Sequence, residues 1–141
     1  DLVRSRGLGD VYKRQVLKQH DMDQIFLLAP TSTDERIQHV VKQASGFIYY
    51  VSLKGVTGAA TLDTAEAAAR IAKIKTHTNV PVGVGFGISD AASAKAMGQV
   101  ADAVIVGSAL VKPFATLAID QAVDQTVNKI KELRAALDEL V

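Results

Sequence analysis

The segment ADAVIVGSALVK, residues 101–112, contains the unit from which the rest of the chain is built. Residues 103–106 form an apolar run of strand length, and Gly107 and Ser108 follow at once as a tight turn. A short helical piece to about Thr116 comes next. Because a strand that is apolar throughout must be covered on both faces, this pattern favours a parallel sheet packed under helices.

The same strand–loop–helix unit occurs four times. Strands are predicted at 25–29, 47–51, 81–86 and 103–106, and helices after Ser32, after Asp63, at 90–99 and at 119–140. Ser32 and Asp63 each have a Glu three residues later, as in a capping box. Gly83 and Gly85 within the third strand predict a close neighbour there. The chain is therefore α/β, either a four-stranded doubly wound domain or half of a (β/α)8 TIM barrel, which needs ~250 residues in all.

Composition excludes several classes of protein. Hydrophobic residues make up 48% of the chain and charged residues 22%, which is typical of a globular domain. Cysteine is absent, so disulfides and thiolate metal sites are excluded, and the three histidines lack metal-ligand spacing. No apolar run approaches the ~18 residues of a membrane-spanning helix. The formal net charge of +1 leaves no basic face for nucleic acid.

Residues 1–15, DLVRSRGLGDVYKRQ, differ from the rest of the chain. They show neither an apolar periodicity nor the apolar core of a signal peptide. We predict an unstructured or foreign N-terminal tail at 1–15 and a domain at 16–141, with an ordinary flexible N-terminus as the alternative.

Four glycines follow the C-terminal ends of predicted strands: Gly55, Gly58, Gly87 and Gly107. In parallel α/β proteins ligands bind at that edge of the sheet. The turns after Gly87 and Gly107 lead straight into helices, whose N-terminal amides suit a phosphate group. Tight βα turns that bind nothing remain the alternative at this point.

Four blocks together resemble the tryptophan synthase α-subunit family in order and spacing. They are IFLLAPTSTDERI at 25–37, VSLKGVTGA at 51–59, VGFGIS at 84–89 and ADAVIVGSALVK at 101–112. The GVTG motif is specific, whereas GSALVK is shared with other phosphate-binding barrels. The resemblance covers about residues 16–141 and implies the C-terminal half of a TIM barrel, strands five to eight, with four βα units.

The resemblance also implies an activity. The family is a cytoplasmic lyase of tryptophan biosynthesis that cleaves indole-3-glycerol phosphate, by a retro-aldol reaction, to indole and glyceraldehyde 3-phosphate. The α subunit has no cofactor, because pyridoxal phosphate belongs to the β subunit that receives the indole in the α2β2 complex. The two acid–base carboxylates of the family lie in its first barrel half. We therefore expect no catalytic residue here and no activity from this chain alone.

The resemblance implies a phosphate and indole pocket. Gly58, Gly87, Gly107 and Ser108 would hold the phosphate. Tyr49, Phe86 and Ile105 would line the indole pocket, with a plain core role as the alternative for each. Thr57 would belong to the mobile loop after strand six. Some members carry Arg at the position of Leu53, which leaves the details of loop closure open.

Two further hypotheses remain at this stage. One is another phosphate-binding barrel, an isomerase or epimerase, although its loop after strand six would not read GVTG. The other is a standalone phosphate-ligand-binding module without catalysis. A half-barrel leaves two open sheet edges and an apolar inner face. We therefore predict that this chain alone is unstable, aggregates, or pairs with another half.

Overall fold

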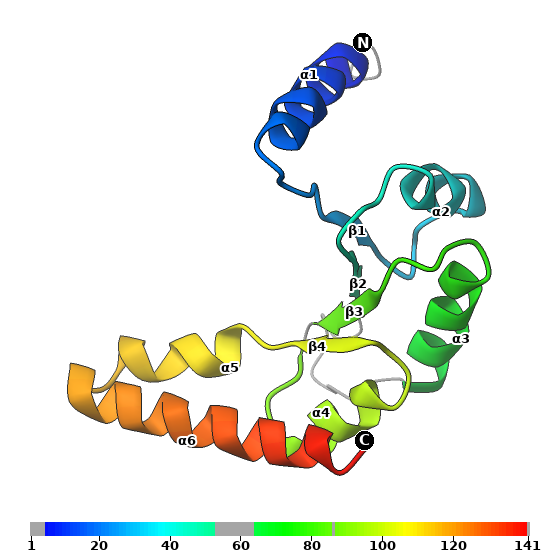
Figure 1. The fold of residues 1–141 in the computed structure, drawn as a ribbon. Helices are drawn as coiled ribbons and strands as arrows, with labels where there is room; N and C mark the ends of the chain where they lie inside the picture. Colours follow the sequence, from blue (N-terminus) through cyan, green and yellow to red (C-terminus); the bar gives the residue numbers. More distant parts are fainter. Residues whose placement is uncertain (1–4, 53–63, 86, 141) are drawn as a thin grey trace.

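The computed structural model describes residues 5–52, 64–85 and 87–140 (Figure 1). Its strands are β1 (Phe26–Leu28), β2 (Ile48–Val51), β3 (Val82–Gly85) and β4 (Ala103–Ile105). Its helices are α1 (Ser5–Gln19), α2 (Asp34–Val41), α3 (Thr64–Lys75), α4 (Ala91–Gly98), α5 (Ser108–Val111) and α6 (Ile119–Asp138), with the 3-10 turn η1 (Lys112–Ala115) after α5. The four predicted strand–helix units are confirmed.

The strands form one sheet in the order β1-β2-β3-β4, and every neighbouring pair is parallel. One row of paired residues runs across the sheet through Leu27, Tyr49, Gly83 and Ala103. Right-handed crossovers between consecutive neighbours keep the helices on one face, whereas a doubly wound sheet reverses its strand order. The order therefore supports half of a barrel over the doubly wound alternative.

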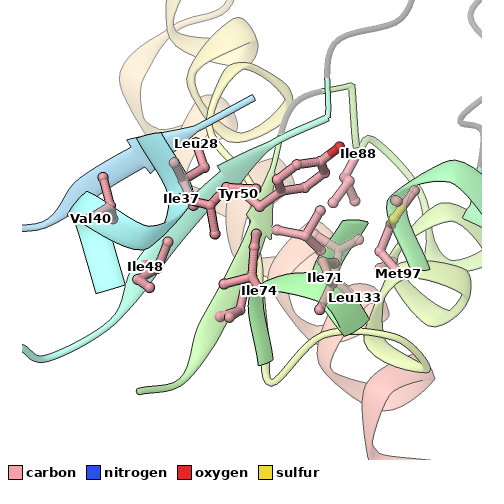
Figure 2. Close-up of a cluster of buried hydrophobic side chains, with 14 residues drawn as sticks. Leu28, Ile37, Val40, Ile48, Tyr50, Ile71, Ile74, Ile88, Met97 and Leu133 are labelled. Atoms are coloured by element: carbon pink, nitrogen blue, oxygen red, sulfur yellow. The ribbon is translucent and has the colours of Figure 1, made fainter. Parts of the chain in front are cut away.

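The hydrophobic core lies between the sheet and its helices (Figure 2). Leu28, Tyr50 and Val84 occupy one row of the sheet and are almost completely buried. Figure 2 shows the Tyr50 ring reaching toward Ile88, with Ile71 nearby. Burial is the main cause that raises the pKa of the Tyr50 hydroxyl. Alternate residues such as Leu27 and Tyr49 point to the opposite face, which would be the barrel interior.

The N-terminus of α2 differs from the predicted capping box. Thr33, not Ser32, is the N-cap, and its hydroxyl accepts a hydrogen bond from the Arg36 amide at 3.3 Å. The Ser32 hydroxyl instead accepts from the Ala29 amide at 3.0 Å. Two adjacent hydroxyl residues can both cap a helix, and the turn after β1 decides which one does. Asp63 lies outside the described residues.

The N-terminal edge of the sheet is held together by Asp102, which directly precedes β4. Its two carboxylate oxygens accept hydrogen bonds from Lys75 Nζ at 2.6 Å and from the Val82 amide at 2.8 Å. The contact joins the end of α3 to the starts of β3 and β4. In a parallel barrel, this end of the strands contributes to stability rather than to ligand binding.

Helix α1 corrects the expectation of an unstructured tail, since residues 5–19 are helical. The prediction relied on apolar periodicity, but a helix that is not packed on a core does not need an apolar face. Figure 1 shows α1 standing apart from the sheet. That residues 1–15 are foreign to the domain stays a prediction. Within the described residues, no helix is both long and apolar enough to cross a membrane.

Candidate functional site

Two exposed glycine turns lie side by side at the C-terminal edge of the sheet. Gly85 of β3 pairs with Ile105 of β4, and Gly87 and Gly107 each follow two residues later. A Cβ atom built on either turn glycine meets no atom within 4 Å. The pairing thus brings the two predicted phosphate-binding turns together, with open space above both.

The two turns differ in what the following helix offers an anion. Gly87 has a φ of +74°, which glycine adopts without strain. Helix α4, however, is capped by its own side chains: Asp90 accepts from the Ser93 amide at 2.8 Å, and Ser93 Oγ accepts from the Ser89 and Asp90 amides, both at 3.3 Å. Side chains of the helix itself thus already bind several amides at the start of α4. The phosphate role of the Gly87 turn stays a prediction.

The turn at Gly107 keeps its helix end uncapped by side chains. Gly107 is the N-cap residue of α5, and no side chain hydrogen-bonds to the helix from that position. Its carbonyl accepts from the Leu110 and Val111 amides at 2.9 and 3.2 Å, which closes the first turn. Ser108, the first residue of α5, is exposed. The first amides of α5 are therefore not capped by a side chain from the N-cap position, and an exposed hydroxyl residue lies beside them.

The inner face of the sheet is shaped by the two glycines of β3. A Cβ atom on Gly85 would lie 2.5 Å from Tyr49 Oη, so the Tyr49 ring covers Gly85 from β2. A Cβ atom on Gly83 would lie 3.1 Å from Ile105 Cδ1, so Ile105 covers Gly83 from β4. The predicted close neighbours of β3 are confirmed. Tyr49 and Ile105 therefore both lie over β3 on the inner face of the sheet.

Ser52, which the sequence analysis did not single out, ties β2 to this site. Its amide and its hydroxyl both donate to the Gly85 carbonyl, at 3.0 and 3.2 Å. Serine after a strand is too common to signal such a contact before the strand pairing is known. The loop that follows Ser52 carries Thr57 and Gly58, and those two residues, like Phe86, lie outside the described residues.

Among the described residues, four carboxyl groups have a pKa below the ordinary value, and each has a structural partner. A hydrogen bond from Lys73 lowers the pKa of Asp34. Hydrogen bonds from Ser93 lower the pKa of Asp90, and a hydrogen bond from Lys129 lowers the pKa of Glu132. For Asp102, burial acts to raise the pKa, but the hydrogen bonds from Lys75 and Val82 outweigh it. A general acid at neutral pH needs the opposite shift. Among the described residues no group of His, Asp and Glu could hold a metal ion.

The sequence matches a known family over nearly its whole length. A family profile described as tryptophan synthase alpha chain matches residues 9–140. The chain belongs to the tryptophan synthase alpha chain family. The tryptophan synthase alpha chain of Acinetobacter baylyi is 92% identical over 126 residues, which are 89% of this chain and 47% of that protein. The Acinetobacter baumannii protein is 88% identical with the same coverage. The chain thus spans about half the length of these curated relatives.

Solved structures agree with this assignment. Tryptophan synthase of Mycobacterium tuberculosis aligns with a TM-score of 0.71 and 38% identity, over 86% of this chain and 44% of that one. A structure from Aquifex aeolicus VF5 aligns with a TM-score of 0.76 and 30% identity, over 93% of this chain and 47% of that one. The sheet of this tryptophan synthase alpha chain member is therefore half of a (β/α)8 barrel, as predicted from the sequence.

Proposed function

We propose that this chain supplies the substrate-binding half of a tryptophan synthase α subunit. One observation carries the proposal: the exposed turns at Gly87 and Gly107 lie side by side above Tyr49 and Ile105 on the inner face of the sheet. An anion-binding edge above an apolar, aromatic-lined surface fits a ligand with a phosphate at one end and an aromatic ring at the other. Indole-3-glycerol phosphate is such a ligand.

The phosphate would bind to backbone amides of the Gly87 and Gly107 turns and to the Ser108 hydroxyl. The absence of side chains at the two glycines lets phosphate oxygens approach the backbone closely. The indole ring would then lie toward Tyr49 and Ile105. Gly58, Thr57 and Phe86 would complete the pocket, as the family resemblance implies for the loops that carry them.

In our proposal, the acid and the base that the retro-aldol reaction needs come from outside this chain. Cleavage breaks the bond between the indole ring carbon and the side chain, so an acid must protonate that ring carbon while a base removes the proton of the side-chain hydroxyl. The family uses two carboxylates from its first half. This half would bind and orient the substrate, and the assembled subunit would act in the cytoplasm, without a cofactor, beside a β subunit that holds pyridoxal phosphate.

Gly107→Ala tests this proposal. Nothing lies within 4 Å of the added Cβ, but the backbone at φ −119° and ψ −79° lies outside the regions that alanine prefers. We expect a small loss of thermal stability and, for the folded chain, about tenfold weaker binding of indolepropanol phosphate, an unreactive substrate analogue, which corresponds to about 1.4 kcal/mol. Binding is measured by titration calorimetry on the chain mixed with a family first half supplied in trans.

The control is Thr116→Ala, a change at an exposed residue beyond η1. It should leave analogue binding unchanged. Indole release from the true substrate should require both halves. Equal affinity of the Gly107→Ala and unsubstituted chains would contradict the phosphate assignment. Binding by this chain alone, with no indole released in the mixture, would favour a phosphate-binding module instead.

A further inference from the structure

Helix α5 is too short to fix its own position. It has four residues, Ser108–Val111, and starts directly after Gly107, one of the two candidate phosphate-binding turns. A helix of a single turn is not stable in isolation. Contacts with the rest of the domain must therefore hold α5, and with it the turn at Gly107, in place.

Two contacts of Leu110 anchor α5. The Leu110 side chain packs against the hydrophobic core. Its carbonyl accepts a hydrogen bond from the Thr126 hydroxyl of α6 at 3.1 Å, and Figure 1 shows α5 lying alongside α6. The amide of the same residue donates to the Gly107 carbonyl at 2.9 Å. Two hydrogen bonds in series therefore connect α6 with the turn.

The sequence after α5 removes one donor for the Leu110 carbonyl. In a 3-10 turn, a carbonyl accepts from the amide three residues later. For Leu110 that residue is Pro113, which has no amide hydrogen. The Thr126 hydroxyl supplies the hydrogen that Pro113 lacks.

Thr126 is the only hydroxyl residue in α6, and it is half-buried. Threonine is less favourable in a helix interior than straight-chain residues are, and its hydroxyl often bonds to a carbonyl of its own helix. Here the single hydroxyl hydrogen goes to Leu110, which is 16 residues away in the sequence. The Thr126 side chain thus serves the contact between α5 and α6 rather than α6 itself.

We propose that Thr126 is a positioning residue for the phosphate group of the substrate. It acts through Leu110, whose backbone it holds, and Leu110 in turn holds the Gly107 turn. Without the hydroxyl, the turn would move away from the geometry that binds the phosphate, and substrate and transition state would be bound equally less well. The inference rests on the proposed function, because it needs the Gly107 turn to bind the phosphate.

Thr126→Val tests this inference, because valine keeps the branched shape of threonine and removes only the hydroxyl. Thr126→Ser keeps the hydroxyl and is the rescue variant. Each chain is mixed with a family first half supplied in trans. For Thr126→Val we expect about fivefold weaker binding of indolepropanol phosphate in titration calorimetry, and a KM for indole release that is about fivefold higher at unchanged kcat. Thr126→Ser should bind the analogue within about twofold of the unsubstituted chain.

Thr76→Val is the matched control. The Thr76 hydroxyl also donates to a carbonyl near the end of a helix, that of Lys73 at 2.7 Å. Thr76 lies between α3 and β3, however, at the opposite edge of the sheet from the candidate site. Thr76→Val should leave analogue binding and KM unchanged. Circular dichroism checks that every variant keeps its helix content.

The outcomes separate this inference from the proposed function. Unchanged affinity of Thr126→Val in a mixture that binds the analogue, equal weakening by Thr76→Val, or a fall in kcat without a rise in KM would overturn the inference alone. Failure of Thr126→Ser to restore binding would also overturn it, since the hydroxyl would then not be the group that matters. No binding by the unsubstituted mixture would overturn the proposed function, and the inference with it.

Discussion

At the scale of single residues, the pocket depends on pairs of side chains and glycines on neighbouring strands. Tyr49 on β2 occupies the space that a side chain at Gly85 on β3 would need, and Ile105 on β4 does the same over Gly83. A glycine in a strand interior weakens that strand. The two glycines therefore weaken β3, but they leave room for an aromatic and an aliphatic side chain over it.

Gly85→Ala should expose this dependence. The added Cβ would lie 2.5 Å from Tyr49 Oη and 2.7 Å from Cε2, so the ring must move. We expect a loss of about 1–3 kcal/mol in the free energy of unfolding, as for other overpacked sites. Tyr49→Leu in the same chain should restore most of that loss because it removes the ring tip. Urea unfolding of the four chains of this double-mutant cycle measures the coupling.

Gly107→Ala is the comparison for this cycle, because alanine there meets no atom within 4 Å. It should lose less stability than Gly85→Ala, since only the backbone angles, φ −119° and ψ −79°, oppose the change. Strictly additive effects of Gly85→Ala and Tyr49→Leu would show that the two residues do not compete for the same space.

The sequence predicted part of this arrangement and could not predict the rest. Two glycines in a strand indicate a close approach, but only the strand register identifies Tyr49 and Ile105 as the groups that approach. The double hydrogen bond from Ser52 to Gly85 depends on the same register. The capping of α4 was not predicted for another reason. The side chains of Asp90 and Ser93 accept hydrogen bonds from amides at the start of the helix, and the glycine turn before the helix gives no sign of these bonds.

At the scale of secondary-structure elements, the strands and the long helices were predictable because their apolar patterns are continuous. Their ends were less so. Serine is the better N-cap in general, yet Thr33 caps α2 because the Ser32 hydroxyl is bonded to the Ala29 amide of the preceding turn. Asp102 gives a clearer case of a residue that joins elements, since it links α3, β3 and β4 through one carboxylate.

Asp102→Asn should destabilise the sheet in a pH-dependent way. Because the folded-state pKa of Asp102 lies below its ordinary value, its ionised form stabilises the fold at pH values above about 4. That contribution is lost as the pH falls through the folded-state pKa. The side chain is 39% exposed, so screening limits the effect, and we expect about 1 kcal/mol at pH 7, shrinking toward zero below pH 4.

Unfolding of both chains in urea from pH 3 to pH 8 measures this difference. Asp34→Asn serves as the control, because the Asp34–Lys73 pair is exposed and should contribute little at any pH. A constant difference between the Asp102→Asn and unsubstituted chains across this range would show that packing, rather than charge, is the role of Asp102.

At the scale of the whole molecule, the sheet and the helices after it share one hydrophobic core, and the described core residues include none from α1. Helix α1 begins in the segment predicted as foreign and stands apart from the sheet (Figure 1). Its last turn borders a hollow of about 650 Å³ that residues near the end of α2 also line. A local helical tendency can produce such a helix without any contribution to the core.

Removal of residues 1–15 tests whether α1 matters to the domain. Since β1 and the core residues that pack on it all follow Val16, we expect the shortened chain to change its free energy of unfolding by less than about 0.5 kcal/mol, the range of substitutions away from structural features. Analogue binding with a first half should also be unchanged. Urea unfolding and titration calorimetry of both lengths measure these two quantities. A loss above about 1 kcal/mol would make α1 an integral part of the fold and contradict the interpretation of residues 1–15 as foreign to it.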